Sequence, residues 1–181
     1  QSAHLNLPFS GDEEFGSLHA AIRLVLPLIP ALGASSPLVE CRTTDFLDNR
    51  MEFYRTNSSR IPSVTGALIP EAVFNRADYD RNIFQPMFQD IAPYDPDGIL
   101  QDEWLNARGA IARFDRNAIE IRVLDIQETP EADLAIAYAI SSVLQAMISE
   151  RWSSFHEQKK MDTGILAELF RQTVRDAEKA P

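Results

Sequence analysis

The sequence contains very little cysteine and has a shortage of positive charge. Cys41 is the only cysteine among 181 residues, which excludes an intrachain disulfide framework and a cysteine-based zinc cluster and fits a reducing cytosol. Lys and Arg number 17 against 27 Asp and Glu, the formal net charge is −10, and no basic run forms a stripe. We therefore expect a cytoplasmic protein that binds neither nucleic acid nor an anionic membrane.

Long uninterrupted apolar runs are absent as well. The longest apolar stretch, residues 18–39, is broken by His19, Arg23, Pro27, Pro30 and Pro37. A membrane helix needs about 20 continuous apolar residues, so this stretch predicts a buried helix with a kink at Pro27. The first residues lack the basic and apolar regions of a secretory signal. The chain opens without Met and enters a strand-like pattern at once, which we interpret as a piece of a longer protein or a processed precursor.

The composition is that of a folded protein. Hydrophobic residues make up 45% and charged residues 24%, which are ordinary values for a globular chain. A length of 181 residues is enough to bury one substantial core, so we expect a single domain over residues 1–181.

Alternating and helical patterns predict both strands and helices. The expected strands are residues 3–9, 108–114 and 118–126, with the last two joined as a hairpin through residues 115–117. The expected helices are residues 12–33, 45–56, 78–91, 129–152 and 162–179. We expect a loop or a short strand at 57–70 and consecutive turns at 92–98. Within the 129–152 helix, residues 134–140 are apolar nearly all round, so we expect this helix to be central in the protein.

The most informative segment is residues 118–125, AIEIRVLD. Side chains two residues apart share a face of a strand, so Glu120 and Arg122 point one way and the aliphatic residues between them point to the core. A carboxylate suits a hard cation and a guanidinium suits a phosphate, so the pair predicts a metal and phosphate platform. A salt bridge on a solvated sheet face explains the same spacing, and spacing alone favours it.

Other polar residues lie on rigid supports near this strand. His4 and Asn6 alternate with apolar residues in the first strand and therefore face together. Arg113 lies opposite Glu120 if the hairpin loop has two residues, and on the other face if it has three. An Arg-rich segment between residues 42 and 60 supplies further cations.

These residues carry a family resemblance. Residues 4–9 (HLNLPF), residues 18–37, and above all residues 112–125, which contain ARF and EIRVLD, resemble the C-terminal half of the glutamate–cysteine ligase type 2 family. This family of carboxylate-amine ligases is related to glutamine synthetase. The resemblance implies an α+β fold in which helices cover an antiparallel, funnel-shaped sheet, with this chain as a partial, C-terminal portion of the catalytic domain. It also implies ATP-dependent joining of an amino acid carboxylate to an amine through an acyl phosphate, with Mg²⁺ bridging the phosphates, as in glutathione-type biosynthesis.

The resemblance also implies roles for individual residues. It makes Glu120 a magnesium ligand and Arg122 a contact to the transferred phosphoryl group, and it makes His4 a ligand of the metal or of the nucleotide phosphates. Asn6 and Arg113 are implied on the nucleotide side of the site. Arg60 is a candidate for a substrate carboxylate, because a bidentate Arg suits that group.

Two departures from the family pattern matter. Asn6 stands where the family's His-X-His pattern would place a second His, and the acidic strand of the family's N-terminal half has no counterpart here. We therefore expect an incomplete site, with an amino acid and an amine as substrates and either a second copy or a missing N-terminal half as partner. A non-catalytic, ligase-derived assembly module is the alternative, and a metal-dependent hydrolase using Glu120 and His4 is a third, weaker hypothesis.

Overall fold

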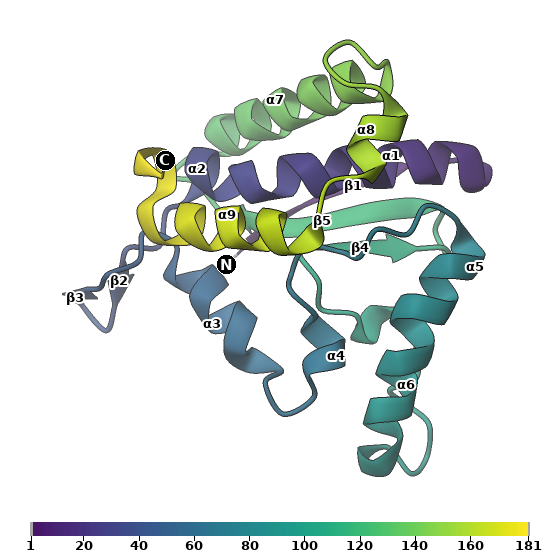
Figure 1. Cartoon of the computed structure of the whole chain (residues 1–181). Coiled ribbons are helices and arrows are strands. Elements are labelled where there is room, and N and C mark those ends of the chain that lie inside the picture. The colour runs from purple at the N-terminus through teal and green to yellow at the C-terminus, as the bar shows by residue number, and fades with distance from the viewer. Residues whose placement is uncertain (1, 181) are drawn as a thin grey trace.

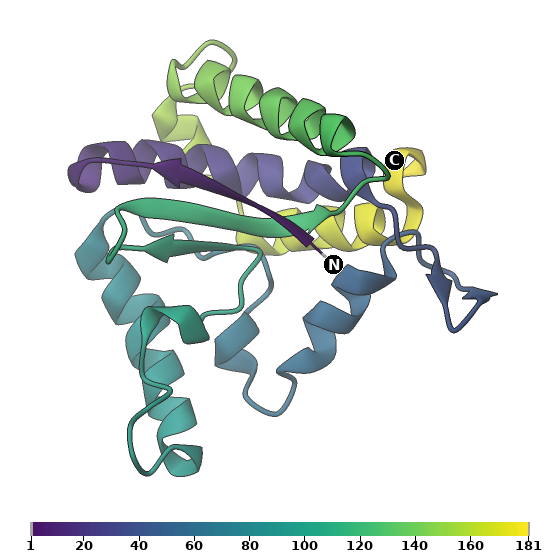
Figure 2. The same cartoon turned by 180° about the vertical axis from the view of Figure 1, so that it is seen from behind.

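A computed structural model describes residues 2–180 and shows an α+β fold built on a small antiparallel sheet (Figure 1). The sheet has the strand order β1-β5-β4, with β1 at Ser2–Pro8, β5 at Ala118–Asp125 and β4 at Ala110–Arg113. Figure 2 shows β1 running beside β5, although more than one hundred residues separate them in the sequence. The predicted fold class and all three predicted strands are therefore confirmed, and the Glu120 strand lies at the centre of the sheet.

The hairpin loop differs from both registers considered from the sequence. Arg113 pairs with Ala118 and Ile111 pairs with Glu120, so residues 114–117 form a loop of four. An even loop length keeps Arg113 on the face of Glu120, but Arg113 lies two pairs along the ladder from Glu120. The loop closes through backbone hydrogen bonds from Arg116 to Arg113 and from Asn117 to Phe114.

The apolar face of the sheet is covered by the kinked N-terminal helix. Ile119, Ile121 and Val123 are 0–1% exposed, as their alternation predicts. The helix consists of α1 at Gly11–Val25, a 3₁₀ turn at Leu26–Leu28 that contains Pro27, and α2 at Ile29–Gly33. Pro27 cannot donate a main-chain hydrogen bond, which explains why the helix changes type there. The C-terminal helix α9, Thr163–Asp176, packs beside the kink and begins after an N-cap at Asp162.

The prediction that the 129–152 helix is central was wrong. Helix α7, Pro130–Ile148, begins at the predicted Thr129 cap but forms the outermost layer, packed against α1 (Figure 1). Only one side of it, with Ile140, Leu144 and Met147, is buried. Leu134 and Tyr138 on the other side are 70% and 77% exposed. A helix with an apolar sequence favours burial of all its sides, but the described residues pack against only one side of α7.

Among residues 2–180, two helical stretches are long and apolar enough to cross a membrane by length and composition alone. In Gly11–Gly33, 72% of the apolar window is buried inside the protein, as in a core helix. In Pro130–Ile148 the buried share is 17%. The first stretch therefore agrees with the predicted buried helix, whereas the second leaves an apolar face open.

The remaining elements follow the predictions with shifted boundaries. Helix α3 is Asn49–Asn57 and starts later than expected, because the Asp48 carboxylate caps it by accepting a hydrogen bond from the Met51 amide. The 78–91 prediction corresponds to α5 at Arg76–Tyr79, a π-helical turn at Asp80–Phe84 and α6 at Gln85–Ile91, where the π turn accommodates Pro86. Elements that the sequence did not predict are β2 at Leu38–Val39, β3 at Arg42–Thr43, α4 at Pro62–Thr65, α8 at Phe155–Lys159 and the 3₁₀ turn at Glu103–Leu105. The predicted turns at 92–98 include a 3₁₀ turn at Ala92–Tyr94, and the predicted 162–179 helix ends in a 3₁₀ turn at Ala177–Lys179.

Candidate functional site

The candidate site is the face of the sheet that carries Glu120 and Arg122. These two residues of β5 share this face by strand alternation, and Asn6 joins them because it pairs directly with Glu120 across the β1–β5 ladder. Glu120 is 7% exposed, Arg122 is half-buried, and Asn6 is exposed. The polar face therefore places a nearly buried carboxylate beside groups that solvent can reach.

One oxygen of Glu120 is engaged and the other is not. Oε1 accepts a hydrogen bond of 2.7 Å from Arg122 Nε, and His4 Nδ1 lies 3.0 Å from the same oxygen. Within residues 2–180, Oε2 has no hydrogen-bond partner. Burial by itself raises the pKa of Glu120, but the hydrogen bond and charge of Arg122, with His4 and Arg113, lower it overall. The carboxylate therefore stays ionised with one oxygen available to a ligand.

His4 is positioned by an irregularity in the ladder. The β1–β5 register shifts between Ala3 and Leu5, so His4 sits at a bulge, which re-aims its side chain. Its Nε2 lies 3.2 Å from the Ser2 hydroxyl while Nδ1 faces Glu120. A ring nitrogen directed at a carboxylate fixes the orientation of an imidazole, and here it also fixes the carboxylate.

Arg122 is held from two directions. Nε donates to Glu120, and Nη1 donates to the backbone carbonyl of Asn106 at 3.0 Å. In the described part of the chain, Nη2 makes no hydrogen bond. The guanidinium thus keeps donor capacity while its Nε contacts the Glu120 carboxylate.

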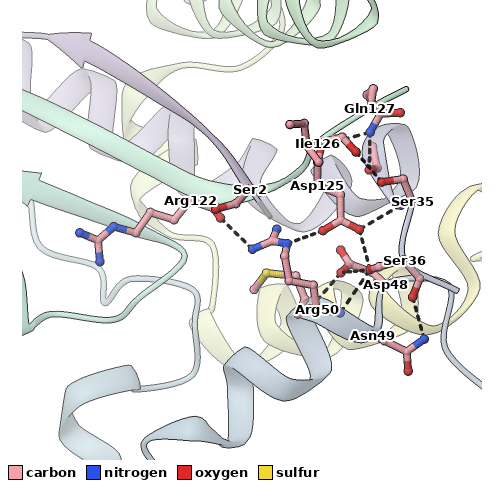
Figure 3. A network of polar contacts seen from close by, with 12 residues as sticks. Ser2, Ser35, Ser36, Asp48, Asn49, Arg50, Arg122, Asp125, Ile126 and Gln127 are labelled. Carbon is pink, nitrogen blue, oxygen red and sulfur yellow. Dashed lines mark hydrogen bonds and ion pairs between the residues drawn. The ribbon is translucent and has the colours of Figure 1, made fainter. Parts of the chain in front are cut away.

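A buried network at the end of β5 also supports Arg122 (Figure 3). Asp125 accepts hydrogen bonds from the Ser35 amide at 3.0 Å and the Ser36 hydroxyl at 2.6 Å, and it pairs with Arg50 Nε. Arg50 Nη1 in turn reaches the backbone carbonyl of Arg122 at 3.4 Å. Sequence reasoning missed this network. The available signal was that Asp125 falls in register with the apolar residues of its strand, where a buried carboxylate needs a cation.

The remaining predicted site residues, Arg113 and Arg60, differ in whether they share the face of Glu120 and Arg122. Arg113 shares the polar face, but its guanidinium is bound to Asp115 through hydrogen bonds of 3.1 Å and 3.0 Å. Arg60 is exposed between α3 and α4, with its guanidinium 4.6 Å from the centroid of the Tyr94 ring. No hydrogen bond or ion pair joins Arg60 to Glu120 or Arg122 within residues 2–180. The structure thus brings His4, Asn6, Arg113, Glu120 and Arg122 to one face and leaves Arg60 outside it.

Comparison with known proteins identifies the family of the chain. The model of glutamate-cysteine ligase family 2 matches residues 1–176. The chain belongs to this family. A relative from Archaeoglobus fulgidus, described as an uncharacterized protein, is 36% identical over 153 residues, which are 83% of this chain and 40% of that protein. The chain therefore spans well under half the length of this curated relative.

Ligases of this kind are expected to use magnesium. The polar face of this chain, which carries Glu120 and Arg122, fits a magnesium ion in part. Mg²⁺ is commonly bound through one or two carboxylates, with water and substrate phosphates completing its shell. Glu120 Oε2 can supply one such ligand, whereas the His4 imidazole suits transition metals better and already faces Glu120. Across residues 2–180 no group of three or more His, Cys, Asp or Glu side chains could hold a metal ion. The residues present therefore fit one side of a magnesium site.

Proposed function

We propose that the polar face forms one wall of the site of an ATP- and Mg²⁺-dependent carboxylate-amine ligase. Family membership supports a ligase-like function in general terms. The observation that carries the finer proposal is the pairing of Glu120 with Arg122, which leaves Oε2 and Nη2 without partners in the described chain. A cation ligand and a phosphate donor then lie side by side, as phosphoryl transfer requires.

In this proposal the substrate carboxylate attacks the γ-phosphorus of ATP, the bond to ADP breaks, and an acyl phosphate forms. The amine then attacks the acyl carbon, a C–N bond forms, phosphate leaves, and the amine loses a proton. Arg122 stabilises the charge on the transferred phosphoryl group, and His4 holds the Glu120 carboxylate in place. Magnesium, when bound, neutralises the nucleotide phosphates. Asn6 and Arg113 line the nucleotide side, and Arg60 is proposed for a substrate carboxylate.

The remaining carboxylates of the site would come from another part of the protein. The described residues offer one well-placed carboxylate, and the outer edge of β1 carries no further strand in the sheet of residues 2–180. Because the chain spans 40% of its relative, we propose that a missing N-terminal half, or a second copy of the chain, completes the wall opposite β5.

The test is Mg²⁺-dependent ATP binding, measured by calorimetry on this chain and on the full-length parent. We expect E120Q to remove the magnesium dependence and R122A to weaken nucleotide binding about tenfold or more, because each loses a charge-assisted contact. R171A is the matched control, because Arg171 also pairs with a carboxylate, Glu168, but on the exposed surface of α9. Unchanged nucleotide binding in both E120Q and R122A would rule out the proposed metal and phosphate platform.

Turnover requires a separate measurement. ATP consumption with a panel of amino acid and amine pairs compares this chain with the full-length parent. Consumption by the parent that is lost in E120Q supports the ligase, whereas amino-acid-independent hydrolysis favours the metal-dependent hydrolase.

A second candidate function is a ligase-derived assembly module, and the exposed face of α7 favours it. Leu134 and Tyr138 present apolar surface on a helix that carries no Asp, Glu, Lys or Arg from residue 134 to residue 148. The open edge of β1 offers unpaired backbone groups to a further strand. If the chain is an assembly module, its polar face binds no nucleotide and the chain self-associates. The same calorimetry tests nucleotide binding, and a mass measurement tests self-association, so together they distinguish this function from the ligase.

A further inference from the structure

The second anchor of Arg122 lies outside the sheet. Arg122 Nη1 donates to the backbone carbonyl of Asn106 at 3.0 Å. Asn106 follows the 3₁₀ turn Glu103–Leu105, precedes β4, and is 0% exposed. A backbone carbonyl in such a connecting segment is a fixed anchor only if something fixes the segment.

The Asn106 side chain provides that restraint. Its Nδ2 donates to the Tyr79 hydroxyl at 2.9 Å, and its Oδ1 accepts from the Arg108 amide at 3.2 Å and from Arg108 Nη1 at 3.1 Å. Three of the four hydrogen-bonding positions of the amide are therefore used. Asn106 is tied at once to α5 and to the residues that lead into β4.

Both partners of Asn106 are themselves immobilised. The Tyr79 ring is fully buried against Phe15 and Phe114, and its hydroxyl also accepts a hydrogen bond of 3.1 Å from the Ala112 amide of β4. Arg108 forms a bidentate pair with Glu71 through two contacts of 2.6 Å. Because Tyr79 binds both Asn106 and β4, it fixes the distance between the connecting segment and the sheet that carries Arg122.

We propose that Asn106 is a positioning residue: its side chain, held by Tyr79 and Arg108, fixes the carbonyl that aims the Arg122 guanidinium. The identity of the ligand that Arg122 binds rests on the proposed function. The positioning of Arg122 does not, because it follows from contacts within this chain. A long Arg side chain loses much rotamer freedom when it binds a ligand, so holding it in advance improves binding of an oxyanion.

The test is nitrogen-15 NMR of the Arg122 side chain, with its Nε–H signal assigned by its loss in R122K. A guanidinium held at both Nε and Nη1 must open before its protons exchange, so exchange reports on the anchor directly. We expect N106A and Y79F each to speed exchange about tenfold, since a hydrogen bond to a charged group is worth about one such factor. Y79F removes a single hydroxyl and keeps the aromatic packing, so it serves if N106A does not fold.

T173V is the matched control. Thr173 is 2% exposed and its hydroxyl donates to the Pro27 carbonyl at 2.6 Å. Within residues 2–180, the side-chain hydrogen bonds of Arg122 go to Glu120 and Asn106 and not to Thr173 or Pro27. T173V removes a buried hydrogen bond of the same kind and should leave Arg122 exchange unchanged. Wild-type exchange rates in both Y79F and N106A, or equal acceleration in T173V, would overturn the proposal.

Titration with Mg·ATP separates this proposal from the proposed function. If wild-type protein binds Mg·ATP, we expect N106A and Y79F to weaken binding about tenfold while Arg122 remains present, because the donor is no longer aimed. Unchanged Mg·ATP binding in these variants would overturn the claim that aiming matters. If neither this chain nor the full-length parent binds Mg·ATP, the ligase proposal fails, and the exchange rates still decide whether Asn106 positions Arg122.

Discussion

At the scale of single residues, Asp48 and Asp125 lie on either side of one serine hydroxyl. The Ser36 hydroxyl is 2.6 Å from an Asp125 oxygen and 3.3 Å from an Asp48 oxygen, and it has one hydrogen to donate. Arg50 pairs with Asp125, and within residues 2–180 no ion pair is formed by Asp48. Burial, followed by the charge of Asp125, raises the pKa of Asp48 from 3.8 to about 6.

The raised pKa of Asp48 predicts a pH-dependent stability. The folded state favours the neutral acid, so the charged form lowers stability above pH 6, and this cost disappears as the pH falls from about 6 toward 3.8. A shift of about 2 pKa units corresponds to at most about 3 kcal/mol. In D48N the side chain stays neutral and still caps α3, so we expect it to be more stable than wild type at pH 7.5.

Denaturant unfolding of wild type and D48N between pH 4.5 and 8 checks this prediction. The difference between the two proteins removes the contribution of every other titrating group. If the difference in unfolding free energy between the two proteins is constant with pH, or if D48N is the less stable protein at pH 7.5, then ionisation of Asp48 costs the folded state little stability.

At the scale of elements, β5 organises the site because both of its neighbours are needed to fix its side chains. β1 brings His4 and Asn6 to Glu120, and the segment before β4 brings the Asn106 carbonyl to Arg122. The approach to β4 is close: a Cβ atom on Gly109 would lie 2.7 Å from Val123 Cγ1 and 3.2 Å from the Leu68 carbonyl. Gly109 therefore lets β4 pack against β5 at this point.

We predict that G109A destabilises the protein by about 1–3 kcal/mol, the usual cost of overpacking a core. The same substitution also weakens the anchoring of Arg122, because the Gly109 carbonyl accepts the Arg122 amide at 2.8 Å. G33A is the control, since a Cβ there would meet only side-chain atoms at 3.7 Å. Chemical denaturation measures both, and equal stabilities for G109A and G33A would contradict the packing argument.

At the scale of the whole molecule, two surfaces of the described chain are left uncovered: the exposed apolar side of α7 and the outer edge of β1. The chain also spans only 40% of the length of a curated relative. Contiguous exposed apolar surface commonly marks an interaction site. We interpret both features as contact surfaces for a second copy of the chain or for the remainder of the parent protein.

We predict that the isolated chain self-associates through α7 and that L134K/Y138K makes it monomeric. Charges at two positions that are 70% and 77% exposed cost little in the monomer but are unfavourable in an apolar contact. F53K is the control, because Phe53 is 60% exposed on α3, away from α7. Light scattering coupled to size exclusion gives the mass, and a monomeric wild type at micromolar concentration would rule out self-association through α7.

The sequence by itself determined the strands, most helix positions, the kink at Pro27 and the shared face of Glu120 and Arg122. These follow from local rules: alternation with a period of two, helical periodicity, caps and proline geometry. The family resemblance was also carried by local residues, and the family match confirmed it.

Only the tertiary structure decided what the polar residues contact. The four-residue loop set Arg113 two pairs from Glu120 along the ladder, and α7 became an outer helix although its apolar sequence indicated a central one. The Asn106 and Arg50 contacts to Arg122 join segments far apart in the chain. No local pattern encodes such pairings, because they depend on which surfaces meet once the sheet and its covering helices have packed.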